Sequence, residues 1–344
     1  MRRTTLAAMM AAAALALVGA GCGSDDDSST STAASTAAST AAATSTPATT
    51  ETSEAASGQI QSNPDNSATT VTVGSKNFTE QKILGEIYAQ ALQAAGYDVK
   101  TELNLGDEKT ALKALQDGQI DAYPEYTGTA LLSFFNVPTD KLEGVDSQQA
   151  YEMVKTDFAK DGIAALPPTP FTNSNEVAVT KETADKLGLE SISDLKGKSQ
   201  DLTLYGTPEC RQRRDCLLGL QETYGLKFKK FVPVDPALRH EVLEKGQADV
   251  SIVFTTDPQI KRNGEVLLSD DKHIFPPYNS TFLVKQSFLD QAGPDFQKTI
   301  ELVNQGLTAE AIQELIARVD LDKQEPDDVA EQYLQESGYV VDND

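Results

Sequence analysis

The side chains that most often perform covalent or acid–base chemistry are scarce in this chain. Among its 344 residues there are only two histidines, His240 and His273, and neither stands in a metal-binding or nucleophile-activating motif. No GxSxG, P-loop or GxGxxG sequence is present. Aspartate and glutamate are abundant, so a pair of catalytic carboxylates is compatible with the composition, but no spacing favours one. We therefore expect a protein that is not an enzyme and that uses no cofactor or metal.

The N-terminal sequence has the layout of a secretory signal. Two arginines precede an apolar run from Leu6 to Val18, which is too short to span a bilayer as a permanent helix. The run leads to Gly21-Cys22, and this stretch resembles a bacterial lipobox. The resemblance implies a signal peptide of residues 1–21 and a lipid on Cys22 that holds the chain on the outer face of the cytoplasmic membrane. An ordinary cleaved signal with a free Cys22 is the alternative.

Two further cysteines, Cys210 and Cys216, are separated by only five residues. Disulfides form and persist in exported proteins, where the environment is oxidising. A zinc site is the alternative, but two thiols without neighbouring histidines make a poor ligand set. We predict a Cys210–Cys216 disulfide that closes a small loop.

Residues 22–69 are rich in serine, threonine and alanine and contain almost no large apolar side chains. Such a segment cannot bury enough surface to offset the entropy lost on ordering, so we predict a disordered tether. A coil of about 46 residues would have a root-mean-square reach of roughly 35–40 Å. That length suits a tether between a membrane and a folded head.

The chain is strongly acidic, with a net charge of 29 − 52 = −23 at pH 7. Binding to a phosphate backbone needs clustered lysine and arginine, so this charge argues against nucleic acid as a partner. The roughly 270 residues that follow the tether predict two domains or one large one.

From Val71 onward, short β-like runs alternate with helical patterns. The clearest helix has apolar residues at helical spacing from Ile83 to Ala95, and Asn77 with Glu80 resembles a capping box at its start. Repeated β–α–β units predict mostly parallel sheets with helices on both faces. Two such lobes would leave a cleft, and ligands of open α/β sheets bind beyond the carboxyl ends of the strands.

Two motifs carry a resemblance to a known family. GSKNFTEQ occupies residues 74–81, and DAYPEYTGT occupies residues 121–129. Shorter matches continue down the chain to FPPY at residues 275–278. Together they resemble the glycine betaine/choline/carnitine (osmoprotectant) class of ABC-transporter substrate-binding proteins, over nearly all of residues 71–339.

The resemblance implies a type II periplasmic-binding-protein-like α/β fold. Each of its two lobes would be a mixed, mostly parallel sheet flanked by helices, and the ligand cleft would lie between the lobes. Lobe I would comprise residues 70–172 and 258–344, and lobe II residues 173–257. A monomeric receptor of this class captures a quaternary-ammonium or betaine-like zwitterion. It then delivers the solute to permease subunits in the membrane that a cytoplasmic ATPase drives.

The family surrounds its ligand with aromatic rings. A quaternary ammonium has no N–H, so ring faces hold it by cation–π attraction. Tyr126 and Tyr278 match ring positions, and Phe254 stands where the family usually has tyrosine. Asn175 replaces another expected ring. We interpret Phe78 as a packing residue.

Polar positions of the family can also be assigned. Arg213, Lys76 and Thr129 match residues that hold a carboxylate tail, and Asn173 could add a polar contact. Lys109 aligns near a position where choline-binding members carry an acid. A cation there would repel choline and tolerate a carboxylate-bearing ligand.

Other functions remain compatible with the sequence. The same receptor could take a different small polar or zwitterionic solute. The scaffold could also carry an extracytoplasmic enzyme, or a surface protein that binds a partner instead of a solute.

Overall fold

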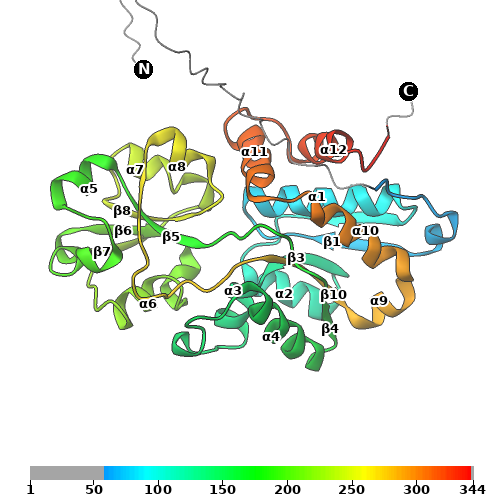
Figure 1. Ribbon diagram of the computed structural model, residues 1–344, viewed down its shortest axis with the longest axis horizontal. Helices are drawn as coiled ribbons and strands as arrows, with labels where there is room; N and C mark the ends of the chain where they lie inside the picture. Colours follow the sequence, from blue (N-terminus) through cyan, green and yellow to red (C-terminus); the bar gives the residue numbers. More distant parts are fainter. Residues whose placement is uncertain (1–57, 342–344) are drawn as a thin grey trace, which may run out of the picture. The chain divides into compact units, whose positions relative to one another are not determined.

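A computed structural model describes residues 58–341 of the chain (Figure 1). The predicted signal peptide of residues 1–21, the predicted lipidation site Cys22 and most of the predicted tether lie outside the described residues. No helix within residues 58–341 combines the length and the apolar character of a membrane span. The strands of this part of the chain form two five-stranded sheets, and each sheet belongs to one lobe.

The sheet of lobe I has the strand order β2-β1-β3-β10-β4. Its strands are β1 (Thr70–Gly74), β2 (Asp98–Glu102), β3 (Ala122–Tyr126), β4 (Ile163–Ala165) and β10 (Ser280–Lys285). β1 is parallel to β2 and β3, whereas β10 is antiparallel to β3 and β4. All residues of the central strand β3 are buried, so the side chains at its end are held in the middle of the lobe.

Helices cover both faces of this sheet. They are α1 (Thr79–Ala94), α2 (Glu108–Asp117), α3 (Thr127–Thr129), α4 (Ser147–Lys160), α9 (Gln286–Ala292), α10 (Pro294–Gln305), α11 (Ala309–Asp320) and α12 (Pro326–Glu336). α1 buries Ile83, Leu84 and Ile87 on one face and packs against α10, α11 and α12. On the other side of the sheet, Leu115 of α2 and Phe158 of α4 belong to a separate apolar cluster.

The sheet of lobe II has the strand order β7-β6-β8-β5-β9. Its strands are β5 (Asn175–Val179), β6 (Thr203–Gly206), β7 (Lys230–Pro233), β8 (Val250–Phe254) and β9 (Val266–Leu268), and its helices are α5 (Lys181–Leu187), α6 (Leu217–Glu222), α7 (Glu241–Glu244) and α8 (Pro258–Asn263). β6 is parallel to β7 and β8, and β5 is antiparallel to β8 and β9.

The predicted two-lobed α/β fold with a mixed sheet in each lobe is confirmed, although parallel pairs do not outnumber antiparallel pairs in either sheet. In each sheet, the strand that follows a crossing from the other lobe, β5 or β10, runs antiparallel to both of its neighbours. The repeated β–α–β pattern could not reveal this, because it describes only strands joined within one lobe.

The chain crosses between the lobes twice, before β5 and before β10, and the two crossing segments run side by side (Figure 1). Thr172 pairs with Asn279 in an antiparallel bridge, and the Asn173 amide donates to the Tyr278 carbonyl. The predicted end of lobe II at residue 257 is wrong, because β9 pairs with β5 and extends this lobe to Leu268.

The predicted tether also ends earlier than expected. Residues 64–68 form a 3₁₀ helix, and the side chain of Asn66 donates a hydrogen bond to the Ala95 carbonyl. Ile60 packs against the apolar cluster of α1 and donates its amide to the Tyr339 carbonyl. The segment also approaches the end of α1 closely, where the Asn63 amide donates to the Ala95 carbonyl. Only glycine fits at position 96, because a Cβ there would lie 2.4 Å from the Asn63 carbonyl oxygen. The sequence did not indicate this, because the residues that pack onto lobe I lie within a segment of mostly polar composition.

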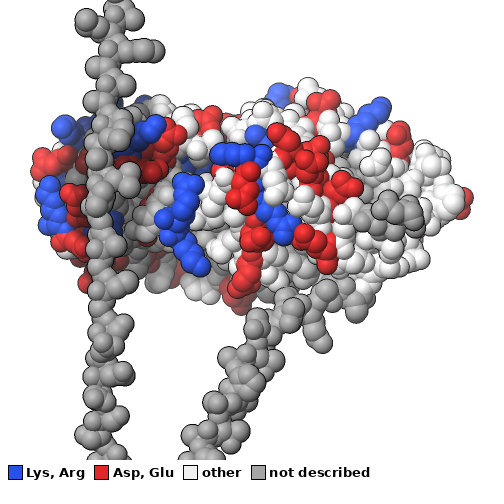
Figure 2. Space-filling model, turned by 90° about the horizontal axis from the view of Figure 1, so that it is seen from above, with Lys and Arg blue, Asp and Glu red and all other residues white. Residues whose placement is uncertain are grey.

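The predicted disulfide between Cys210 and Cys216 is confirmed, and both residues are buried. It flanks Arg213 and ties the turn after β6 to the start of α6. On the face seen from above, Lys and Arg side chains lie among Asp and Glu side chains and form no single basic surface (Figure 2).

Glu176 on β5 should make stability depend on pH. Burial, followed by the negative charge of Asp270, raises the pKa of Glu176 to about 7. A carboxyl with a raised folded-state pKa stabilises the fold fully below its unfolded pKa of about 4.3, and this contribution is lost as pH rises through about 7. We expect Glu176→Gln to raise the melting temperature at pH 8 much more than at pH 5, as measured by calorimetry. The exposed Glu190→Gln is the control, and an equal rise at both pH values would contradict the assignment.

Candidate functional site

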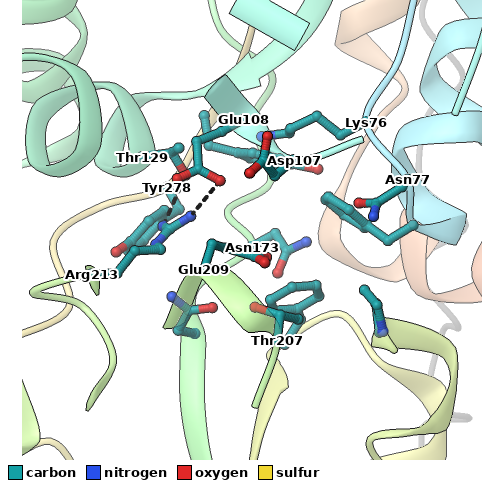
Figure 3. Close-up of a pocket in the computed structure, with 15 residues that line it drawn as sticks. Lys76, Asn77, Asp107, Glu108, Thr129, Asn173, Thr207, Glu209, Arg213 and Tyr278 are labelled. Carbon is teal, nitrogen blue, oxygen red and sulfur yellow. Dashed lines mark hydrogen bonds and ion pairs between the residues drawn. The ribbon is translucent and has the colours of Figure 1, made fainter. Parts of the chain in front are cut away.

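A pocket opens between the two lobes at the ends of several strands (Figure 3). Its walls come from the loop after β1, the start of α2, the end of β3, both crossing segments, and the loops after β6, β7 and β8. The lining residues are Lys76, Asn77, Phe78, Asp107, Glu108, Tyr126, Thr129, Asn173, Asn175, Thr207, Glu209, Arg213, Pro236, Phe254 and Tyr278. The carboxyl ends of strands from two sheets therefore converge on one site, as expected for open α/β folds.

Four aromatic rings line this pocket. Phe78 lies between two of the others, with its centroid 6.2 Å from that of Tyr126 and 5.2 Å from that of Phe254. The ring of Tyr278 packs on Gly128, where an added Cβ would lie 2.5 Å from the ring. Phe78 packs against the apolar core of lobe I, as predicted, and it also forms part of the pocket wall, which the sequence did not indicate.

Both pocket tyrosines donate their hydroxyls to buried carboxylates. The Tyr126 hydroxyl is 2.5 Å from Glu80 Oε1, and the Tyr278 hydroxyl is 2.5 Å from Asp215 Oδ2. Burial raises the pKa of both tyrosines well above the usual range, so both rings remain neutral phenols. These bonds fix how the rings present themselves to the pocket.

Arg213 already has anionic partners. Its guanidinium binds both carboxylate oxygens of Asp215, lies 3.6 Å from Glu108 Oε2, and donates to Thr129 Oγ1 at 3.3 Å. Burial alone would raise the pKa of Asp215, but the Arg213 guanidinium holds it below its usual value. Asn175 adds hydrogen bonds from its side chain to Asp215. The residue that replaces an expected ring thus supports the ion pair.

Lys76 is paired as well. Its ammonium forms an ion pair with Glu125, which is fully buried, and lies 4.5 Å from the centroid of the Tyr126 ring. Glu125 also accepts a hydrogen bond from the Tyr126 amide at 2.8 Å. Both cations on the pocket wall are therefore neutralised by protein carboxylates.

The placement of Lys109 in the site is wrong. Lys109 is exposed and does not line the pocket, whereas the preceding residue, Glu108, is buried and does. α2 begins at Glu108, and successive residues of a helix point about 100° apart, so a displacement of one residue reverses the assignment. An acid, with Asp107 and Glu209 nearby, occupies the wall where a cation was expected.

Two of the residues that line the pocket each carry a buried acceptor atom without a hydrogen-bond partner. The atoms are Glu108 Oε1 and Asn173 Oδ1. Buried polar atoms are normally satisfied, so such atoms in a pocket wall mark places where a ligand atom can bind. Because both are acceptors, they favour a ligand that brings positive charge or a donor.

Eight of the nine residues predicted to bind ligand line the pocket, all but Lys109. Sequence reasoning missed the carboxylates Glu80, Asp215 and Glu108. Glu80 stands inside the GSKNFTEQ motif and Asp215 two residues after Arg213, so their positions were visible although their partners were not. Within residues 58–341, no three His, Cys, Asp or Glu side chains gather as a metal site would require.

Comparisons with known proteins agree with this geometry. The family described as the substrate binding domain of ABC-type glycine betaine transport systems matches residues 69–336. The glycine-betaine-binding protein of Pseudomonas aeruginosa is 35% identical over 280 residues, which span 78% of this chain and 88% of that protein. The glycine betaine-binding protein YehZ of Escherichia coli is 28% identical over 288 residues, which span 80% of this chain and 93% of YehZ.

Solved structures match at the level of the fold. A glycine betaine/carnitine/choline ABC transporter structure has a TM-score of 0.61 and 27% identity, and the match covers 78% of this chain and 99% of that one. Ligand-free YehZ from Escherichia coli has a TM-score of 0.56 and 28% identity, with the same coverage. These matches identify the two lobes as a type II periplasmic-binding-protein fold.

The Lys76–Glu125 pair should be needed for stability. Lys76→Met leaves the Glu125 carboxylate buried without a counter-charge, and breaking such a pair costs about 3–5 kcal/mol. We expect a loss of this size in urea unfolding. The double variant Lys76→Met/Glu125→Gln should recover most of the loss because no charge is then left unpaired. A double variant as unstable as the single one would contradict the argument.

Proposed function

Because the chain belongs to the family of substrate-binding domains of ABC-type glycine betaine transport systems, we propose that it captures a quaternary-ammonium solute between its lobes. It is the extracytoplasmic binding receptor of an ABC importer and not an enzyme, and it hands the solute to the permease subunits. Family membership supports the receptor role. The class of ligand is argued from the pocket.

One observation carries the ligand assignment: the pocket combines aromatic walls with an excess of acidic groups. Lys76 and Arg213 are each neutralised by a carboxylate, and Glu108 adds a further negative charge. Ring faces attract cations, most strongly where water is excluded. A ligand with a methylated ammonium group would supply the charge that this wall lacks.

The same balance of charge distinguishes among quaternary-ammonium ligands. A carboxylate tail would have to compete with Asp215 and Glu108 for Arg213, whereas a hydroxyl could donate to an unpartnered oxygen such as Asn173 Oδ1. The pocket therefore favours a choline-like cation over glycine betaine. This reverses the expectation drawn from Lys109.

The place of action follows from residues before the described part of the chain. The proposed lipid anchor at Cys22 and the segment that follows it would keep the receptor close to its permease on the outer face of the cytoplasmic membrane. The apolar N-terminal run and the Gly21-Cys22 sequence support this location.

Calorimetric titration of the mature protein with choline, glycine betaine, carnitine and proline betaine tests the proposal. We expect binding, and we expect Phe254→Ala to weaken it at least about tenfold, because a desolvated cation–π contact contributes about 2 kcal/mol. Phe231→Ala is the matched control, since Phe231 is a half-buried ring in the same sheet outside the pocket. If none of the four compounds produced heat, the ligand class would be wrong.

Glu108 should set the preference between choline and glycine betaine. We expect the wild-type protein to bind choline more tightly. Glu108→Gln should reduce the ratio of the two affinities at least about fivefold, because it removes a charge that favours the cation and frees Arg213 for a carboxylate. Lys109→Gln is the adjacent control and should leave the ratio unchanged. A ratio that follows Lys109 instead of Glu108 would refute this arrangement.

A further inference from the structure

The two carboxylates that hold the pocket tyrosines differ in one respect. Asp215 is neutralised by Arg213, whereas Glu80 forms no ion pair with any residue in the described part of the chain. Glu80 is nevertheless buried, with 2% of its surface exposed. An unpaired buried carboxylate is unfavourable unless hydrogen bonds or a nearby cation compensate it.

Three neutral donors converge on Glu80. Its Oε1 accepts from the Tyr126 hydroxyl at 2.5 Å and from Asn173 Nδ2 at 2.9 Å, and its Oε2 accepts from Thr256 Oγ1 at 2.6 Å. The predicted capping pair of Asn77 and Glu80 is not formed, because α1 begins after Phe78 without a side-chain cap. The side chain of Glu80 points instead to the contact between the lobes, since Thr256 follows β8 of lobe II.

The charge near Tyr126 is unbalanced as a result. Lys76 is countered by Glu125, so an ionised Glu80 leaves one excess negative charge beside the ring. Burial, together with the negative charge of Asp257, raises the pKa of Glu80, whereas the hydrogen bonds from Thr256, Tyr126 and Asn173 act in the opposite direction and favour its ionised form. A phenol that donates to a carboxylate becomes more electron-rich, and its face then attracts a cation more strongly.

We propose that Glu80 is a specificity-determining residue that makes the pocket prefer a cationic ligand over a neutral molecule of the same shape, acting through the hydroxyl of Tyr126. Glu80 does not line the pocket, so it acts without contacting the ligand. The ligand cation on the face of the Tyr126 ring would supply the counter-charge that Glu80 lacks. This inference rests on the proposed function, because it requires a quaternary-ammonium ligand.

A purely structural role for Glu80 makes a different prediction. If Glu80 only tied the lobes together through Thr256, its loss would weaken all ligands by the same factor. If its charge acts through the ring, its loss weakens a cation more than a neutral isostere. The ratio of the two affinities therefore separates the two roles.

The experiment compares choline with its uncharged carbon isostere, 3,3-dimethyl-1-butanol, by calorimetry and by competition. Glu80→Gln keeps the shape of the side chain: its amide oxygen can accept from Asn173 and its amide nitrogen can donate to Thr256. We expect Glu80→Gln to lower the choline-to-isostere affinity ratio at least about fivefold. Tyr126→Phe should lower the ratio similarly, and the double variant should lower it no further.

Two controls separate closure and folding from charge. Thr256→Val should weaken both compounds equally and leave the ratio unchanged, because it removes one hydrogen bond between the lobes and keeps the bond from Tyr126 to Glu80. Glu86→Gln, on the same helix but outside the pocket, should change neither affinity. Thermal unfolding reports whether each variant folds, and Tyr126→Phe provides the test if Glu80→Gln does not.

The outcomes are distinct. An unchanged ratio in Glu80→Gln and Tyr126→Phe, with or without equal weakening of both compounds, would overturn the inference and leave the proposed function intact. If the protein binds glycine betaine and not choline, the matched pair is glycine betaine and 3,3-dimethylbutanoate, with the same expected ratios. Absence of binding to every quaternary-ammonium compound would instead refute the proposed function, and the inference with it.

Discussion

The pocket depends on buried carboxylates that hold its rings and its cations in place. Glu125 and Asp215 pair with Lys76 and Arg213, and the hydroxyls of both pocket tyrosines end on a carboxylate. A cation–π site needs rings whose faces stay in position while water is excluded, because a ring that rotates loses the geometry of the attraction. Hydrogen bonds from both tyrosines to buried carboxyl groups provide this rigidity. The bond to Asp215 is the stronger kind, because Arg213 keeps that acceptor ionised.

The crossing segments explain why these groups meet. Asn173 lies on the first crossing and Tyr278 on the second, and their backbones are joined by a hydrogen bond. The remaining wall residues follow the carboxyl ends of strands in both sheets, so both lobes contribute to one pocket. Arg213 reaches from lobe II to Glu108 and Thr129 of lobe I, and closure therefore assembles part of the polar wall. The crossings also account for the mixed sheets, because β5 and β10, which each follow a crossing, run antiparallel to the strands beside them.

Much of the fold could be predicted from the sequence, because strands and amphipathic helices leave a local periodic signal. The position of α1 follows from such a pattern. The pairing of β9 with β5 could not, since a three-residue strand carries no periodicity. In the site, motif matches located the rings and cations, but the carboxylate partners join residues far apart in sequence, as Glu80 and Thr256 do. The prediction that Lys109 lines the site was wrong for a geometric reason: a shift of one residue at the start of a helix changes which side chain faces the pocket.

Closure and selectivity are linked through the same acids. Glu80 and Glu108 are both buried in this structure, and removing carboxylates from water is costly when no cation accompanies them. If the lobes open to admit a solute, these acids would oppose closure around an empty pocket. A bound quaternary-ammonium group would reduce that cost and a neutral group would not, so the proposed ligand would favour the closed form more than a neutral molecule of the same shape. A ligand can shift the equilibrium between open and closed forms only by the difference in its affinity for the two forms. The acids that make closure unfavourable in an empty pocket would therefore also make closure depend on the charge of the ligand.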